Sequence, residues 1–241
     1  MFVNNVNRIF VVSENADDVL LHNLKKHGKV LILKRHSSLL PSESAHVDMQ
    51  LNRITDKLCV YASGLDNNII DCLESEGIEL IAGSVVLKEK YPFNIAYNVL
   101  HSDKIYFHNV KFTDPVLKAL LDERKMKSIN VKQGYAGCSG IFVNDILITS
   151  DKGIATAAEM NNIEYIYFNN PQCILLEGFD HGFIGGCCGY DKELGLLINC
   201  NENNMPECLK FDLKTKDISY LCVGKSVLTD IGGIAVFTGQ K

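Results

Sequence analysis

Four side chains have the types that carry nucleophilic and acid/base chemistry: His46, Asp48, Cys138 and Asp180. A cysteine thiolate is a strong nucleophile, and a nearby imidazole can lower the pKa of the thiol and pass its proton to a leaving amine. Carboxylates such as Asp48 and Asp180 can orient a cationic group. The set predicts covalent catalysis by Cys138, with His46 as the general acid/base.

Each of these residues also has an ordinary structural interpretation. The chain contains nine cysteines, and cysteine is among the most buried residue types, so Cys138 could be a core residue. His46, beside Asp48, could cap the end of a strand. His181 competes with His46 for the proton-transfer role, or it is a hydrogen-bonded histidine of a loop.

The adjacent Cys187 and Cys188 raise the alternative of a zinc site, with His181, Cys200 or Cys208 as further ligands. Zinc sites usually separate their two cysteines by roughly two to four residues. Adjacent residues of a strand point to opposite faces, so Cys187 and Cys188 cannot both bind one ion easily. We therefore expect no metal and no cofactor.

A repeat of roughly 45 residues determines where these side chains lie. Each copy begins with a signature segment and continues with a turn, an apolar strand, a helix and a second apolar strand. The signatures start at positions 46, 93, 138, 183 and 231. Asp66 and Gly77 have the residue types that begin and end a helix, and Asp114 followed by Pro115 opens another. Strands are expected at 58–61, 104–107, 146–149 and 194–199, and helices at 66–76, from 113, at 154–161 and, weakly signalled, at 206–210.

The fifth signature, residues 230–237, is followed by neither a helix nor a closing strand. The missing parts are an amphipathic helix at 16–27 and a strand at 30–33, so the two ends of the chain complete one repeat. A doubly wound sheet also alternates strands and helices, but it gives no reason for a split repeat. We expect one α/β domain over residues 1–241. It would be a five-fold pseudo-symmetric α/β propeller of strand-strand-helix-strand repeats, closed by the terminal segments.

The order of the signatures resembles that of the guanidine-modifying enzymes, the pentein superfamily. His46-Val47-Asp48 and the alternating segment after it are similar to the His-x-Asp motif of agmatine and arginine deiminases. Residues 93–98 resemble the Asn-aromatic segment of the next repeat in those enzymes. Residues 133–139 resemble the glycine-rich approach to their catalytic cysteine.

The last two signatures match the superfamily less completely. Phe179-Asp180-His181-Gly182 keeps the Asp and Gly of an Arg-Asp-x-Gly segment, whose Asp grips the guanidinium group, but lacks the Arg. Asp230-Ile231-Gly232-Gly233 keeps the glycines of a Glu-Gly-Gly segment, with an acid shifted by one position. The resemblance covers the whole chain and implies a shorter, circularly rearranged pentein.

The resemblance implies a hydrolase or amidinotransferase that acts on a small guanidino or amidino compound. Cys138 would form a covalent amidino intermediate, with His46, Asp48 and His181 as the other catalytic residues. The substrate-binding residues implied are Asp180, Asn94, Tyr97, Ser139 and Asp230. A second class remains open, a non-catalytic pentein that serves as a binding module, as in the ribosome anti-association factor that shares this fold. The absence of the Arg from the segment at residues 179–182 keeps this non-catalytic alternative open.

Composition limits the partners and the compartment. The net charge of -5 argues against nucleic acid, whose phosphates require clustered Lys and Arg. No apolar run reaches about 18 residues, so we expect no membrane span. An odd number of cysteines and no visible signal peptide favour a reducing cytoplasm over a disulfide framework. We expect a small-molecule substrate as partner, and the oligomeric state stays open.

Overall fold

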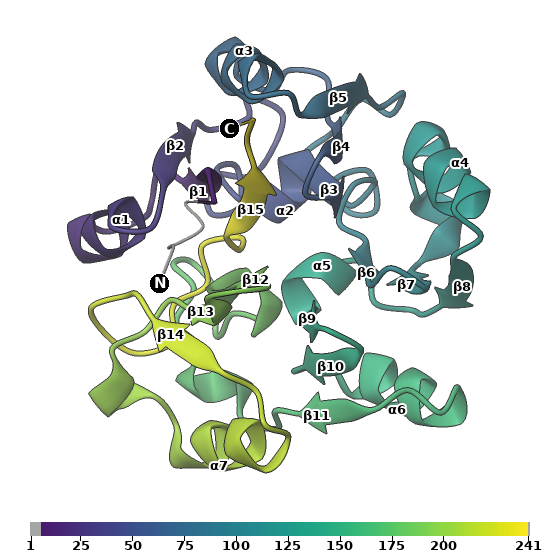
Figure 1. Cartoon of the computed structure of the whole chain (residues 1–241). Helices are drawn as coiled ribbons and strands as arrows, with labels where there is room; N and C mark the ends of the chain where they lie inside the picture. Colours follow the sequence, from purple (N-terminus) through teal and green to yellow (C-terminus); the bar gives the residue numbers. More distant parts are fainter. Residues whose placement is uncertain (1–5, 241) are drawn as a thin grey trace.

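The computed structural model describes residues 6–240, which form five sheets of three strands each around a central region (Figure 1). Four of the sheets follow one another along the chain. Their strands, in order, are β3 (Leu51–Thr55), β4 (Leu58–Tyr61) and β5 (Glu79–Ala82); β6 (Leu100–His101), β7 (Ile105–His108) and β8 (Lys127–Asn130); β9 (Gly140–Val143), β10 (Ile146–Thr149) and β11 (Tyr165–Tyr167); and β12 (Cys188–Asp191), β13 (Gly195–Ile198) and β14 (Tyr220–Cys222).

The fifth sheet is built from both ends of the described chain. Its order is β15 (Ala235–Thr238), β1 (Arg8–Ser13) and β2 (Lys29–Leu33). Strand β15 pairs antiparallel with β1, with Ile9 opposite Phe237. This is the split repeat that the sequence predicts. The repeat pattern does not predict strand β1, because residues 8–13 precede the first recognisable helix and carry no signature.

All five sheets share one pattern of pairing. The first strand of each is antiparallel to the second, and the second is parallel to the third. Parallel neighbours require a crossover connection, and a helix supplies it in every unit. These helices are α3 (Asn67–Ser75), α4 (Pro115–Glu123), α6 (Lys152–Met160), α7 (Glu207–Thr215) and α1 (Asp18–Lys25).

Local cap chemistry sets the helix ends that the sequence predicts. The Asp66 carboxylate accepts a hydrogen bond from the Asn68 N–H at the start of α3, and Asp114 accepts two in the same way at the start of α4. Gly77 follows α3 with a φ of +75°, a backbone conformation that favours glycine. Helix α7 has no side-chain cap and is longer than predicted, because its buried Leu209 and Leu213 hold it.

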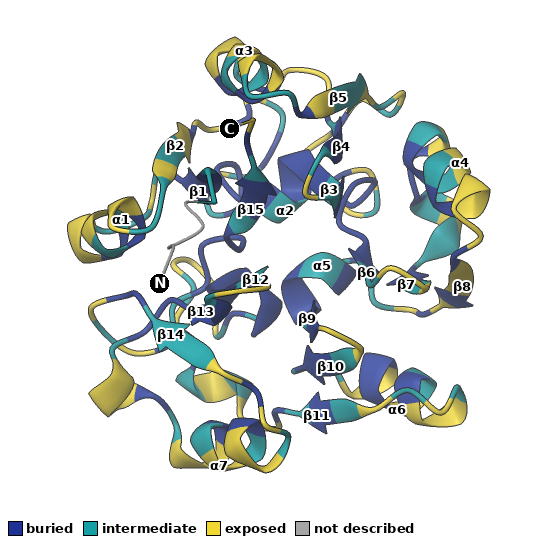
Figure 2. Cartoon of the chain, in the orientation of Figure 1, coloured by how far each residue is buried: buried dark blue, intermediate teal, exposed yellow. Residues whose placement is uncertain are grey.

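The apolar core consists of five clusters, each shared between consecutive units of the chain. One cluster joins Leu33 of the fifth sheet to Leu51 and Leu73 of the first. Another joins Leu20 of α1 to Leu197 of β13, so the last unit packs on both of its neighbours. The outer faces of the helices are exposed, whereas the inner strands are buried (Figure 2). Across residues 6–240, no helix has the length and apolar character needed to cross a membrane.

The signature segments lie at the centre, and two of them form single helical turns. These turns are α2 (Val47–Gln50), which leads into β3, and α5 (Ala136–Ser139), which leads into β9 (Figure 1). His46 is therefore the N-terminal cap residue of a helical turn, and the interpretation that it caps a strand end is wrong. The turns bring side chains of different repeats to one place.

Candidate active site

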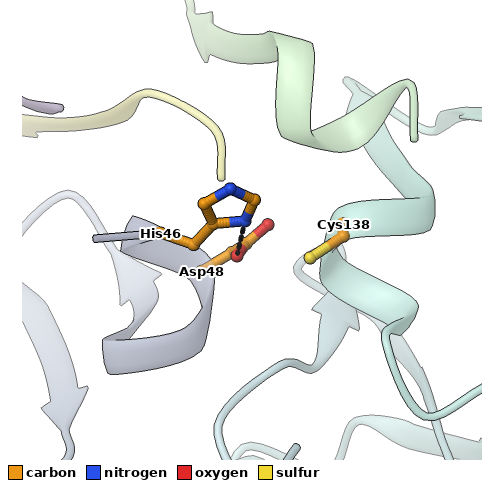
Figure 3. Close-up of side chains that lie close together, drawn as sticks. All are labelled: His46, Asp48 and Cys138. Atoms are coloured by element: carbon orange, nitrogen blue, oxygen red, sulfur yellow. Dashed lines mark ion pairs between the residues drawn. The ribbon is translucent and has the colours of Figure 1, made fainter. Parts of the chain in front are cut away.

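His46, Asp48 and Cys138 meet at the centre of the molecule. His46 directly precedes α2 and Asp48 lies within it. Cys138 points toward both residues from α5 (Figure 3). A ring nitrogen of His46, a carboxylate oxygen of Asp48 and the sulfur of Cys138 all lie within 4.8 Å of one another. Such separations are within reach of a proton transfer with a small adjustment of side chains or through one water molecule. The sequence places these residues two repeats apart, and the fold brings them together.

Asn98 fixes the two helical turns relative to each other. Its buried Nδ2 donates to the Cys138 Sγ at 3.1 Å and to the Asp48 carbonyl at 3.1 Å. Its Oδ1 accepts the Cys138 N–H, also at 3.1 Å. A single side chain thus orients the sulfur. Asn98 is the last residue of the second signature segment, and it is not among the site residues predicted from the sequence.

Asp230 forms the far side of the site and is 4% exposed. Its carboxylate accepts the backbone N–H groups of Phe183, at 2.9 Å, and Gly232, at 3.0 Å. One of its oxygens lies 4.0 Å from the Nδ1 of His46. Asp48 lies at the same distance from that nitrogen, so the imidazole is placed between two carboxyl groups.

Two glycines allow this close approach. A Cβ on Gly186 would lie 1.9 Å from an Asp230 oxygen, so a larger residue there would displace the carboxylate. Gly232 has a φ of +78°, and a Cβ on it would lie 2.3 Å from that of His46. The glycine pairs of the fourth and fifth signatures therefore serve the packing of the site.

The site gathers acidic groups, and among residues 6–240 no lysine or arginine lines its cavity to balance them. Burial and the neighbouring Asp230 raise the pKa of Asp48 well above its ordinary value, and burial also raises the pKa values of Asp230 and Glu43. Both carboxylate oxygens of Asp48 are buried and have no hydrogen-bond partner among residues 6–240. Burial lowers the pKa of His46, so the imidazole is neutral. A bound cation would balance the negative charge of these buried carboxyl groups.

The surroundings of Cys138 favour the thiol over the thiolate. Burial, Asp48 and Asp230 all raise the pKa of its sulfhydryl well above the ordinary value. The carboxyl groups around Cys138 oppose the expected lowering of this pKa by the imidazole, because burial favours the neutral form of His46. A positive charge beside the sulfur would oppose this shift and favour the thiolate.

A cavity of about 320 Å³ opens from the sulfur to the surface. Its walls mix acidic, apolar and aromatic side chains. They are Glu43, His46, Met49, Tyr135, Cys138, Leu176, Phe179, Asp180, His181, Phe183 and Asp230. Asp180 is exposed, so it belongs to the mouth and not to the buried acidic group. His181 is also part of this wall, where its Nδ1 lies 3.0 Å from the Gly182 carbonyl and its ring stands edge-on to Phe183.

Four residues of the predicted site lie outside the cavity lining: Asp48, described above, and three others. Asn94 is buried behind the wall, where its Nδ2 donates to Glu43 and to the Tyr135 hydroxyl, both at 2.8 Å. The Tyr97 hydroxyl donates to the Val85 carbonyl at 2.6 Å in the core. The Ser139 hydroxyl donates to the Tyr135 carbonyl at 2.6 Å. Asn94 therefore positions two lining residues, and the structure does not bring Tyr97 or Ser139 to the cavity.

The same three central residues could hold a divalent ion. In the part of the chain that the structure describes, His46, Asp48 and Cys138 form the one set of three or more His, Cys, Asp or Glu side chains close enough to share a metal. Cys187 and Cys188 do not belong to it. Nitrogen, oxygen and sulfur ligands at about 2.0–2.3 Å are those of tetrahedral zinc.

Zinc should therefore block the Cys138 thiol. We expect micromolar Zn²⁺ to slow alkylation of Cys138, with full recovery after chelation, measured by mass spectrometry of the Cys138 peptide. In His46→Ala the zinc concentration needed should rise about tenfold, which corresponds to about 1.4 kcal/mol of binding. Equal protection of the exposed Cys208 would show that the effect is not specific to this site.

Comparison with solved structures places this arrangement among known folds. The structure resembles the arginine dihydrolase ArgZ of cyanobacteria, with a TM-score of 0.52 and 11% identity over 90% of this chain and 37% of that chain. It resembles AgrE in complex with ornithine and NAD+, with a TM-score of 0.53 and 10% identity over 98% of this chain and 40% of that one. For the C. jejuni agmatine deiminase the TM-score is 0.51, at 10% identity over 91% of this chain and 88% of the deiminase.

The fold is that of the pentein superfamily of guanidine-modifying enzymes. The chain spans well under half the length of ArgZ and AgrE, and the low identities establish the fold alone. The model of the family of unknown function DUF6873 matches residues 11–235, and the chain belongs to that family. No curated protein gives a significant match to the sequence.

Proposed function

We propose that this chain is a guanidine- or amidine-modifying enzyme that works through a covalent intermediate on Cys138. The observation that carries the proposal is the buried group of carboxyls around a thiol and an imidazole whose neutral form burial favours, with no lysine or arginine of residues 6–240 in the cavity lining. A planar guanidinium or amidinium supplies that charge and can donate two hydrogen bonds to one carboxylate. Asp48 is its proposed partner, and Asp230 adds a second negative charge.

The proposed architecture is a single domain over residues 1–241, a closed propeller of five pseudo-symmetric units. Two observations support closure: β15 pairs with β1, and an apolar cluster joins the fifth unit to the first. Closure matters for the function, because Asp230 comes from the segment that ends the chain and His46 from the first signature. Their 4.0 Å approach depends on the last unit being in place.

Binding of the cation is the proposed trigger for the chemistry. Its positive charge favours the Cys138 thiolate, and His46 accepts the thiol proton. The sulfur forms a bond to the central carbon and gives a tetrahedral intermediate. His46 then donates its proton to the leaving amine as the carbon–nitrogen bond breaks, which leaves an amidino thioether on Cys138.

The second half-reaction releases the product. Water attacks the amidino carbon while His46 takes its proton, the carbon–sulfur bond breaks, and a ureido or amide product leaves the Cys138 thiolate. With an amine in place of water, the amidino group is transferred. His181, at the cavity wall, is the proposed second proton carrier, and Asp180 at the mouth attracts the cation.

A matched pair of electrophiles tests this proposal. 2-Chloroacetamidine is a cation and 2-chloroacetamide is its neutral counterpart, and both alkylate a thiol with loss of chloride. We expect a preference for the amidine at Cys138 at least about tenfold larger than at the exposed Cys208, because only Cys138 is surrounded by carboxyls. Asp48→Asn should reduce this ratio toward that of Cys208.

The covalent step needs its own measurement. Wild-type protein is mixed with a guanidine that it converts and is then quenched in acid. The Cys138 peptide should carry the added mass of an amidino group, and the corresponding peptide of Cys138→Ala should not. Binding of guanidines without any adduct or product would instead favour the non-catalytic binding module. Equal rates for the two electrophiles at Cys138 would contradict the cation site itself.

A further inference from the structure

We propose that the substrate of this site carries an apolar substituent and no carboxylate, so that the protein takes alkyl- or arylguanidines, or the matching amidines, and not guanidino acids. This inference rests on the proposed function, because it concerns the group attached to the cation. It is carried by the charges and side chains that line the cavity beyond the central residues.

The cavity offers no partner for a carboxylate. Eleven residues line it, and within the described chain none of them is a lysine or an arginine. The ionisable side chains nearest the mouth are Asp180 and His181, and Glu43 lies further in. A substrate carboxylate would be desolvated next to groups of its own charge, without the cation that such burial requires. Guanidino acids are therefore selected against.

The remaining walls match an apolar substituent. Met49, Tyr135 and Phe183 present apolar surface inside the cavity, and Leu176 and Phe179 extend it outward. Phe179 is 50% exposed and lines the cavity, so the mouth itself has an apolar margin. Exposed apolar side chains grouped beside a cavity favour a ligand that covers them.

The size of the cavity limits the substituent. A volume of about 320 Å³ is at the lower end of the range for small-molecule sites, roughly 300–1,000 Å³. The planar cation occupies the inner part, beside Cys138 and Asp230; Asp48 is not part of the cavity lining but has an oxygen within 4.8 Å of the Cys138 sulfur. The rest holds a short alkyl chain or one aromatic ring against Phe179 and Phe183, with the outer end near Leu176.

Two ligands of the same length separate the alternatives. Butylguanidinium ends in a methyl group where 4-guanidinobutanoate ends in a carboxylate. Calorimetry with Cys138→Ala prevents turnover during the titration. We expect 4-guanidinobutanoate to bind at least about tenfold more weakly than butylguanidinium, because of like charge at the wall.

Charge reversal at the mouth provides a second test. Asp180→Lys should weaken the attraction for the guanidinium of both ligands but supply a positive charge for the carboxylate, so the affinity for 4-guanidinobutanoate relative to butylguanidinium should rise about tenfold. Glu177→Lys is the matched control, since Glu177 is exposed on the same segment and does not line the cavity. It should leave the ratio of the two affinities unchanged.

The outcomes distinguish this inference from the proposed function. Equal or tighter binding of 4-guanidinobutanoate by the protein with Asp180 intact would overturn the apolar-substituent inference and leave the guanidine site standing. If butylguanidinium, 4-guanidinobutanoate and guanidinium itself all fail to bind, the proposed function fails and this inference fails with it.

Discussion

Asp48→Asn should make the protein more stable at pH 7.5 while removing its activity. The wild-type carboxylate is buried without a hydrogen-bond partner in the described chain, and leaving a polar group in that condition costs about 1–3 kcal/mol. The amide has no charge to desolvate. For a chain of this length, each kcal/mol of added stability raises the Tm by about 2–4 °C. Functional sites often lower the stability of a protein for this reason, so variants that remove their charged groups are often more stable.

The same residue should set the pH dependence of stability. Burial raises the pKa values of Asp48, Asp230 and Glu43 in the folded protein. A carboxyl with a raised pKa favours folding in its protonated form. Its contribution is therefore complete below the pKa of the unfolded chain, near 4, and is lost as the pH rises through the raised value. The free energy of unfolding contributed by these groups should increase as the pH falls from 8 to 5.

Urea denaturation at several pH values measures both effects. The slope of unfolding free energy against pH should be smaller in Asp48→Asn than in the wild type. Asp71→Asn provides the control, because Asp71 is exposed on α3 and should leave the slope unchanged. A loss of stability in Asp48→Asn would show that the carboxylate is paired in the folded protein, and the cation argument would lose its basis.

Cys138 should react slowly with the neutral reagent iodoacetamide near neutral pH, with a rate that keeps increasing above pH 9. The thiolate is the reactive form, and burial together with Asp48 and Asp230 raises the pKa of this thiol. Asp48→Asn removes one negative charge and should accelerate alkylation at pH 8 about tenfold for each unit by which the pKa falls. Peptide mass spectrometry follows Cys138 against the exposed Cys208 as an internal reference.

An apparent pKa below about 7 for Cys138 in the free protein would contradict the expectation of a raised thiol pKa. It would mean that the sulfur is already a thiolate, paired with a charged His46. His46→Gln separates the two cases. It should leave the alkylation profile nearly unchanged if the imidazole is neutral, and should raise the apparent pKa strongly if an ion pair exists.

Repeat length and cap chemistry are properties of short segments, so the sequence predicts them well. Strand β10 lies at the residues expected, and α4 begins after Asp114 as its cap residue indicates. The regular spacing of the signatures also predicts that β15 pairs with the N-terminal part of the chain. These features depend on local propensity and on periodicity alone.

The details of the site depend on distances between repeats, which spacing does not contain. Asn98 contacts Cys138 across 40 positions of sequence, and nothing in its own segment distinguishes it from Asn94. The raised pKa of Cys138 results from burial and from two acids of other repeats. Phe179 comes from a segment without periodicity, so its place in the cavity wall could not be predicted.

The sheet shared by β1 and β15 has a consequence for synthesis of the protein. Until residues 235–238 leave the ribosome, β1 has an unpaired edge, and such an edge can pair with another chain. Contacts between residues more than two hundred positions apart also form late, because they close the longest loop of the chain. Asp230 belongs to the same late segment. A nascent or truncated chain can therefore contain Cys138 but not the completed acidic site, which forms only when residues 230–238 are in place.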